Sequence, residues 1–548
     1  MSKFTSHESD VLVVGAGPVG LTLASELTRY GVRCRVLDKD AGPENISKAI
    51  IVHVRTQEVL AAMNALAPAL AESKPLRQVE VHAYGKHIGH CDLDGIDSPY
   101  PHPIIIGQNR TEHILEQHLN SLDIKVDWQV EATGFQQDES GVTVTLRHAD
   151  GRVEETRTQW LIGCDGSNSI VRKQLELNFE GDRYENEQFI QADVKIRWTL
   201  PKGVSYLFLT NAGYMMVIEM PDDIVRVFIS APDPDPSNET PPTLSEVQEA
   251  LIELGGIDAQ LYEPVWLARY RTSHCRADRF REGRVFVAGD AGHVHVLIGG
   301  QGMNTGIQDA FNLAWKLAYV IKGVAHPELL DSYNAERHPV AVALLEGTDK
   351  AYRSIFNKSE LFQKAARLLS PMIIQMESLQ TRIRNTLEEV TISYKDSPLT
   401  VDVGGSSGPV AGERAPDAVL VRLADKETIR LFEVFQGTDW TMLLLSGQAM
   451  NPLSYRNLTA IGKTIGDKYG HIIKPHLVVA DIAPPQLPEE LDWNGSILMD
   501  SQQYLHKKYG ASSACLYLVR PDWYIGFRGH PSDTDKLMTY LAGVLIGV

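Results

Sequence analysis

The stretch Val11-Leu-Val-Val-Gly15-Ala-Gly17-Pro-Val-Gly20 decides the fold class of this chain. Its apolar residues predict a buried parallel strand, and its three glycines lead into a helical pattern over residues 21–30. The glycines permit a tight turn and let a pyrophosphate approach the amide groups at the helix N-terminus. A second strand, residues 34–37, ends at Asp38, where an acid can hydrogen-bond a ribose hydroxyl. We therefore predict a Rossmann-like dinucleotide-binding unit.

Two later segments repeat an apolar run that ends in small and acidic residues. Residues 160–164 lead into Asp165-Gly166, and residues 284–288 lead into Gly289-Asp290. A further glycine cluster, residues 299–304 (the glycine loop), then opens a helical pattern. Because the carboxyl ends of parallel strands meet at one edge of a sheet, we expect all three segments to form one site. Asp290 can hold a ribityl hydroxyl there, and the loop amides can face the pyrimidine edge of a flavin.

Length and composition exclude several other classes of protein. A chain of 548 residues is too long for one core, so several domains are expected. The net charge of −18 argues against nucleic acid or an anionic membrane as a partner. The five cysteines are scattered and have no CxxC or metal-ligand spacing, so we expect neither a disulfide framework nor a metal site. We find no secretory signal and no apolar stretch of about 18 residues, and we expect a cytoplasmic protein without a membrane span.

The order of the predicted elements indicates three domains. Residues 187–231 form consecutive strands without helices, which predicts an antiparallel sheet inserted into an α/β chain. The stretch Val403-Gly-Gly-Ser-Ser-Gly-Pro409 resembles a linker, and a separate α/β pattern follows it. We expect a dinucleotide-binding domain formed by residues 1–78, 100–182 and 274–400. Residues 79–99 and 183–273 are expected to form an inserted sheet domain, and residues 411–548 a C-terminal domain.

Together these motifs resemble the class A FAD-dependent aromatic hydroxylases, the family of p-hydroxybenzoate hydroxylase, phenol hydroxylase and pentachlorophenol monooxygenase. The run Asp309-Ala-Phe-Asn-Leu-Ala-Trp-Lys316-Leu extends the third motif, and the resemblance covers about residues 8–350. From Ala411 onward the chain is similar to the thioredoxin-like domain of the phenol hydroxylase subgroup, but without a redox CxxC. The resemblance thus implies an α/β chain with a Rossmann-like FAD-binding domain, an inserted antiparallel-sheet substrate domain and a thioredoxin-like C-terminal domain.

The resemblance also implies roles for individual residues. Residues expected to bind FAD without a covalent link are Gly15, Gly17, Gly20, Asp38, Arg55, Gln108, Asp165, Asp290, Gly300, Gly302, Met303 and Asn304. Candidates for a catalytic group near a phenol oxygen are His53, Tyr206, Tyr214 and His295, whereas His293 is expected to be structural. A loop position for His53 and core packing for the two tyrosines stay open as alternatives.

Three positions depart from the family pattern. Leu297 stands where proline is usual, and Gly292 stands where alanine is usual, so the rigidity of this loop is in question. Ile50 stands where phenol hydroxylase carries an aspartate near the substrate ring, so that base is not carried over.

The activity implied by the resemblance is aromatic hydroxylation. NADPH or NADH reduces FAD, O2 adds to give a C4a-hydroperoxide, and one oxygen atom passes to a phenolic or similarly activated ring. A polyketide-type hydroxylase or epoxidase on the same fold stays open, as does a non-catalytic flavin-binding scaffold. The expected partners are an aromatic small molecule, O2, NAD(P)H and a second copy of the chain in a homodimer.

Overall fold

The first glycine motif lies at the centre of a sheet with the strand order β19-β20-β11-β1-β2-β8. In the computed structural model, β1 pairs in parallel with both β2 and β11, and β11 pairs in parallel with β20. Since these strands run the same way, the three predicted motifs meet at their carboxyl edge. The strands are β1 (Ser9–Val14), β2 (Cys34–Asp38), β8 (Val126–Trp128), β11 (Val153–Gly163), β19 (Arg281–Glu282) and β20 (Val285–Val287).

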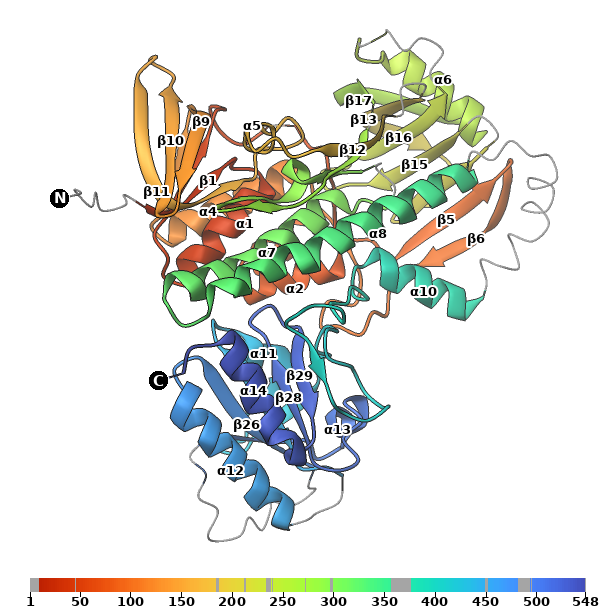
Figure 1. Ribbon diagram of the computed structural model, residues 1–548. Coiled ribbons are helices and arrows are strands. Elements are labelled where there is room, and N and C mark those ends of the chain that lie inside the picture. Colours follow the sequence, from red (N-terminus) through yellow and green to blue (C-terminus); the bar gives the residue numbers. More distant parts are fainter. Residues whose placement is uncertain are drawn as a thin grey trace.

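Helices cover this sheet, and α7 is buried along nearly its whole length. It packs beside α1, α2 and α8 (Figure 1). The structure describes residues 9–547 apart from 45, 184–186, 211–212, 233–237, 239, 272, 296–298, 356–375, 449–451, 481–492 and 494. The helices of this part are α1 (Pro18–Arg29), α2 (Val54–Ala62), α3 (Leu66–Glu72), α4 (Gln108–Ser121), α5 (Ile170–Gln174), α7 (Gly302–Ile321), α8 (Asp331–Ile355) and α10 (Glu377–Leu387).

The β-ribbon predicted around residues 127–153 is confirmed. Strands β9 (Val130–Asp138) and β10 (Gly141–His148) pair antiparallel with each other, and β10 pairs with β11. Two small sheets complete the domain: β12 (Phe179–Arg183), β18 (Ser273–Ala277) and β21 (His293–Val294) form one, and β3 (Ile51–Val52), β4 (Lys74–Pro75) and β7 (Ile104–Ile105) form the other.

The predicted run of strands forms a seven-stranded sheet in the order β17-β13-β16-β15-β14-β5-β6. Its strands are antiparallel, except that β14 pairs in parallel with β5. Side chains alternate between an outer face, covered by α6 (Leu244–Gly255), and an inner face that contacts residues 47–51. The strands are β5 (Gln78–Ala83), β6 (Lys86–Asp92), β13 (Glu187–Trp198), β14 (Ser205–Leu209), β15 (Tyr214–Glu219), β16 (Val225–Pro232) and β17 (Ala259–Tyr270).

The C-terminal part has its own sheet, with the order β22-β29-β28-β25-β26-β27-β23-β24. Since β22 (Val401–Asp402) pairs with β29, this sheet begins before the stretch predicted as a linker. That stretch is packed: a Cβ atom at Gly408 would lie 2.3 Å from the carbonyl oxygen of Tyr509. The other elements are β23 (Val419–Arg422), β24 (Thr428–Arg430), α11 (Leu431–Phe435), β25 (Trp440–Leu445), α12 (Pro452–Tyr469), β26 (Ile473–Val479), β27 (Ser496–Met499), α13 (Tyr504–Lys508), β28 (Cys515–Val519), β29 (Ile525–Gly529) and α14 (Thr534–Val544).

A buried ionic network joins this C-terminal part to the helices of the first domain. Arg520, between β28 and β29, donates to Glu336 of α8 at 2.6 Å, and Glu336 also accepts from Lys316 of α7 at 2.7 Å. Burial lowers the pKa of Lys316 to about 8, although Glu336 opposes the shift. Asp522 accepts from the indole nitrogen of Trp315 at 3.2 Å. One continuous core runs through both parts, so the C-terminal part is not a free-standing module.

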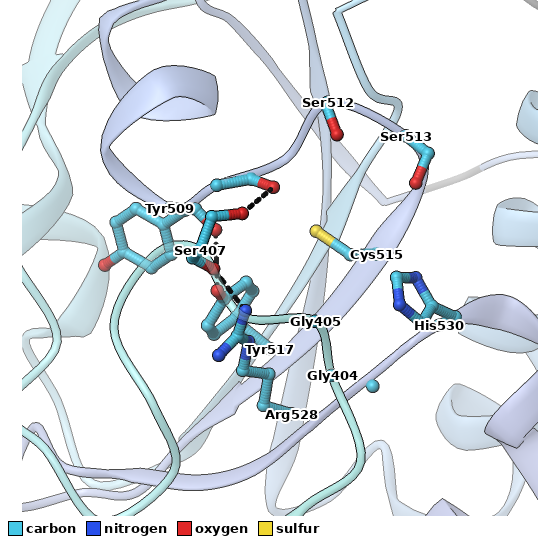
Figure 2. A pocket seen from close by; sticks show the side chains of 12 residues that line it. Gly404, Gly405, Ser407, Tyr509, Ser512, Ser513, Cys515, Tyr517, Arg528 and His530 are labelled. Atoms are coloured by element: carbon cyan, nitrogen blue, oxygen red, sulfur yellow. Dashed lines mark hydrogen bonds between the residues drawn. The ribbon is translucent and has the colours of Figure 1, made fainter.

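A small cavity of about 80 Å³ lies inside the C-terminal part (Figure 2). The side chains around it include Cys515, Ser512, Ser513, Arg528 and His530. Burial raises the pKa of the Cys515 thiol to about 12, so the thiol stays protonated near neutral pH. Because the thiolate is the reactive form, Cys515 is a poor nucleophile in this position.

Within the part of the chain that the structure describes, no helix is both long and apolar enough to cross a bilayer. The same residues contain no group of three His, Cys, Asp or Glu side chains arranged to hold a metal ion.

Candidate functional site

The turn between β1 and α1 is crowded at two glycines and open at the third. A Cβ atom at Gly15 would lie 2.3 Å from the carbonyl oxygen of Cys164, and one at Gly20 would lie 1.9 Å from that of Gly15. A Cβ atom at Gly17 would meet nothing within 4 Å. Gly17 also caps α1 without a side-chain hydrogen bond, so the first amides of α1 are presented to an anion.

Asp38 ties the end of β2 to this turn. Its Oδ2 accepts from the backbone N–H of Ala16 at 2.7 Å, and its Oδ1 accepts from that of Asp40 at 3.0 Å. The residue is half-buried, and each carboxylate oxygen can accept a further hydrogen bond. Asp38 therefore supports the glycine turn and can also receive a ribose hydroxyl.

Asp290 lies at the carboxyl edge of the sheet, in the short turn that follows β20. The residue is exposed, yet the protein surrounds it closely enough that desolvation raises its pKa, with His293 and Lys48 opposing the shift. Because the residue is exposed, its carboxylate is available to accept hydrogen bonds from ligand hydroxyl groups.

A buried cluster of charged residues supports the turn that contains Asp290. Asp309 of α7 accepts from the backbone N–H of Gly289 at 3.1 Å and from Nε2 of His293 at 2.7 Å. Arg337 donates to the other oxygen of Asp309 at 2.6 Å. Burial alone would raise the pKa of Asp309, but Arg337 and His293 lower it. The geometry thus supports the structural role expected for His293 and explains why the Asp309 motif accompanies the turn.

The second motif fixes the same turn from another side. Arg172 donates to the carbonyl oxygens of Ala291 at 3.1 Å and Ser167 at 2.8 Å. Asp165 accepts from the backbone N–H of Ile170 at 2.7 Å, so its Oδ2 caps α5. In this structure Asp165 and Arg172 shape the edge of the site around Asp290.

The glycine loop leads into α7 and leaves its first amides without a side-chain cap. Gly299 and Gly300 both adopt positive φ angles, +80° and +68°, which favour glycine. The Asn304 side chain accepts from the backbone N–H of His53 at 2.9 Å and donates to the carbonyl oxygen of Gly300 at 2.9 Å. Met303 is half-buried beside these amides. Gly302 and its neighbours therefore present a helix N-terminus where negative charge is favoured.

Gln108 and the seven-stranded sheet hold residues 47–49 between them. Oε1 of Gln108 accepts from the backbone N–H of Ala49 at 3.1 Å. On the other side, Arg226 donates to the carbonyl oxygen of Lys48 at 2.8 Å and is paired with Asp193 at 2.7 Å. Lys48 is exposed, and its charge lowers the pKa of Asp290. The Lys48 side chain also pairs with Glu44 at 3.0 Å, and the sequence motifs gave no signal for this residue.

Arg55, the basic residue expected at the flavin, points elsewhere. Its guanidinium group donates to Glu58 at 2.9 Å and to the carbonyl oxygen of Asp522 at 2.7 Å, and it lies over the ring of Tyr524. These contacts face the C-terminal part. The reason is helical geometry: Arg55 lies in the first turn of α2, one turn from Glu58, on the side that packs against residues 522–524.

The two candidate histidines support the glycine loop. His53 is buried, and its Nε2 lies 2.8 Å from the carbonyl oxygen of Gly299, with its Nδ1 3.2 Å from Glu388. Burial lowers the pKa of His53, but Glu388 and its neighbours outweigh this and raise it to about 9. His295 is also buried, and its Nε2 lies 3.2 Å from the position of a Cβ atom at Gly302.

The two candidate tyrosines lie on opposite faces of the seven-stranded sheet. Tyr206 belongs to the outer core beneath α6, and its hydroxyl donates to the carbonyl oxygen of Pro201 at 2.8 Å. Tyr214 is on the inner face, packed with Phe189 and Phe228. Because strand residues alternate between faces, the position of Tyr206 places it away from residues 47–51. Leu297, whose effect on loop rigidity was in question, lies outside the described residues.

The comparisons with known proteins agree with this geometry. A family model described as an FAD binding domain matches residues 8–348, which include all three motifs. The chain belongs to this FAD-binding domain family. It is 32% identical to 6-methylpretetramide 4-monooxygenase of Streptomyces rimosus, over 97% of this chain and 92% of that protein. It is 31% identical to pentachlorophenol 4-monooxygenase of Sphingobium chlorophenolicum, over 99% and 97% respectively.

A solved structure also matches nearly the whole chain. The anhydrotetracycline hydroxylase OxyS from Streptomyces rimosus aligns over 98% of this chain and 99% of its own, with a TM-score of 0.76 and 29% identity. The FAD-binding chain is therefore a flavoprotein aromatic monooxygenase, with a small-molecule substrate, O2 and a reduced nicotinamide as its partners. The features of the site fit FAD. The uncapped N-termini of α1 and α7 offer backbone donors, the exposed Asp290 offers an acceptor, and the space beside Gly17 is open.

Proposed function

We propose that this enzyme hydroxylates a phenolic ring held between the glycine loop and the inner face of the seven-stranded sheet. The observation that carries the proposal is that residues 47–51 contact the inner face of this sheet, while Ile51 also lies against Gly300 of the glycine loop. Bound FAD supplies hydride acceptance and oxygen activation. The protein's own residues bind the two ligands, orient them and exclude water.

The proposed FAD contacts follow the geometry of the site. The α1 amides at Gly17 would hold the pyrophosphate, Asp38 the adenosine ribose, and Asp290 the ribityl chain. The α7 amides would face the flavin ring. We propose Lys48 in place of Arg55 as the basic residue of the site, because Lys48 favours the charged form of Asp290 whereas the Arg55 guanidinium group binds the carbonyl oxygen of Asp522.

The inner face of the sheet is apolar where it meets residues 50 and 51. Leu207, Met216 and Ile218 pack there with Ile51, and Tyr214 lies further along the same face. Such a surface suits a flat aromatic ring, and Tyr214 supplies a phenolic hydroxyl on the same face. We propose Tyr214 as the residue that contacts the substrate oxygen, and we assign Tyr206, His53 and His295 supporting roles.

A fused-ring phenol is the second candidate substrate. Two of the similar proteins are named for tetracycline-type substrates and one is named for a chlorinated phenol. Rates of NADPH and NADH oxidation with single-ring phenols, hydroxybenzoates and fused-ring phenols would separate these classes. We expect acceleration by phenols and a product one oxygen atom heavier; acceleration by fused rings alone would favour the second candidate.

Four further proposals accompany the activity. We propose that residues 1–78, 100–182 and 274–400 form one domain and residues 79–99 and 183–273 another. The pairing of β5 with β14, and of β6 with β5, supports this division. The C-terminal domain is proposed to be thioredoxin-like and to begin near residue 401. A homodimer and a cytoplasmic location are also proposed, the latter because the reaction consumes reduced nicotinamide.

A further inference from the structure

Helix α10 leads from the edge of the seven-stranded sheet to the FAD-binding domain (Figure 1). Near its start, Gln380 donates to the carbonyl oxygen of His90 in β6 at 3.2 Å. One turn later, Arg384 lies 3.8 Å from the carboxylate of Asp92, also in β6. The helix then ends at Leu387, and residues 387–389, here called the clasp, follow the glycine loop closely.

Leu387 contacts both sides of the proposed substrate space. It packs against an apolar cluster that includes Ile51 and, from the inner face of the sheet, Ile218. A Cβ atom at Gly299 would lie 2.9 Å from the Leu387 side chain, so the loop backbone passes directly beside it. The clasp therefore lies between the seven-stranded sheet and the loop that is proposed to face the flavin.

Glu388 fixes the first turn of α2. Its Oε2 accepts from the backbone N–H of Val54 at 2.9 Å, and its carbonyl oxygen accepts from that of Arg55 at 3.2 Å. Its Oε1 lies 3.2 Å from Nδ1 of His53, whose Nε2 lies 2.8 Å from the carbonyl oxygen of Gly299. Glu388 is fully buried, so its charge acts at low dielectric on His53 and through it on the glycine loop.

Glu389 fixes the first two turns of α7. Its two oxygens accept from the hydroxyl of Thr305 at 2.7 Å and from the side-chain amide of Gln308 at 2.5 Å. Glu389 is 3% exposed and has a left-handed backbone, with φ of 59°. Such a conformation has a cost outside glycine and persists only where the surrounding contacts hold it.

We propose that the clasp sets the position of the glycine loop relative to the seven-stranded sheet, with Glu388 as a positioning residue that acts through His53. The proposal rests on the function proposed above, because it assigns the clasp to the same flavin and substrate site. A ligand that moves β6 or Ile218 would move Leu387, and the two glutamates would pass that displacement to both ends of the glycine loop. Glu388 and Glu389 do not touch the reacting atoms.

Amide hydrogen exchange of residues 299–305 in the FAD-loaded enzyme tests the proposal directly. Loss of a hydrogen bond to a buried charge corresponds to roughly a 10- to 100-fold change in an opening equilibrium. Glu388→Gln should therefore accelerate exchange in this segment at least tenfold. Glu377→Gln is the matched control, because it removes the same charge from the exposed first turn of the same helix. In this control variant, the amides of residues 299–305 should exchange at the wild-type rate.

Glu389→Gln provides a second route if Glu388→Gln fails to fold, and it should accelerate exchange at Thr305 and its neighbours. In both variants, peroxide formed per NAD(P)H consumed should rise several-fold with a phenolic substrate. Wild-type exchange and wild-type coupling in both folded variants would overturn the role of the clasp. If the wild type oxygenated no aromatic compound, the proposed function would be wrong. The exchange measurement would still show whether the clasp positions the glycine loop.

Discussion

Asp290 is the residue on which the placement of FAD depends most. It combines an exposed carboxylate with a turn held by Asp309 and Arg172. A hydrogen bond to a charged group contributes about 1.5–3 kcal/mol, so Asp290→Ala should weaken FAD binding roughly 10- to 100-fold. Flavin absorbance per chain after dialysis measures this loss. Asp258→Ala, at an exposed position of the seven-stranded sheet domain, is the control and should stay fully loaded. Equal loading of both variants would remove Asp290 from the site.

The raised pKa of His53 predicts that the stability of the fold depends on pH. Its pKa in the folded protein is about 9, above the ordinary value of 6.5, because Glu388 outweighs burial. A group with a raised pKa stabilises the fold fully below pH 6.5 and loses that contribution as pH rises through 9. The shift corresponds to roughly 3 kcal/mol. The melting temperature of the wild type should therefore exceed that of His53→Gln at pH 6 and approach it at pH 9.5. A constant difference across this range would show that the pKa of His53 is the same in the folded and the unfolded protein.

Among the elements, the β1–α1 turn contains glycines with different expected roles: Gly20 is needed for folding and Gly17 for FAD binding. Gly17→Ala should leave the melting temperature of the FAD-free protein nearly unchanged, because a Cβ atom there meets nothing within 4 Å. It should still weaken FAD binding, since the new methyl group lies where the pyrophosphate is expected. Gly20→Ala should destabilise the FAD-free protein itself, because its Cβ atom would lie 1.9 Å from the Gly15 oxygen. Parallel melting and FAD titrations compare the two; an equal loss of stability in both variants would contradict this division.

The elements that sequence alone predicted are those with local signals. The strand ends at Gly15, Asp165 and Asp290 could be read from apolar runs followed by glycine and acid, and the structure brings them to one edge. Lys48 and the clasp could not be predicted in this way. Lys48 is held by Arg226, 178 residues away, and Glu388 meets Val54 across 334 residues. Arg55 was assigned from its place after the first βαβ unit, and the direction of its side chain depends on a turn far along the chain.

At the scale of the whole molecule, the buried ionic network predicts that the C-terminal domain stabilises the FAD-binding domain. Arg520→Met would leave Glu336 with Lys316 alone among its charged partners, and breaking such a buried pair costs about 3–5 kcal/mol. Arg422→Met breaks an exposed pair with Asp425 in the same domain, and because water screens that pair, its loss should change stability little. Urea denaturation followed by flavin fluorescence should show early FAD release only for Arg520→Met. Identical release midpoints would mean that the two domains are energetically independent.

The assembled molecule is expected to insert an oxygen atom from O2 into a phenolic ring. Incubation with NADPH or NADH, isotopically labelled 18O2 and a panel of phenols, followed by mass spectrometry, tests this activity. We expect a product that carries one labelled oxygen, formed together with faster nicotinamide oxidation. Oxidation of nicotinamide without label in any aromatic product, or label found only in a non-aromatic olefin or ketone, would contradict it.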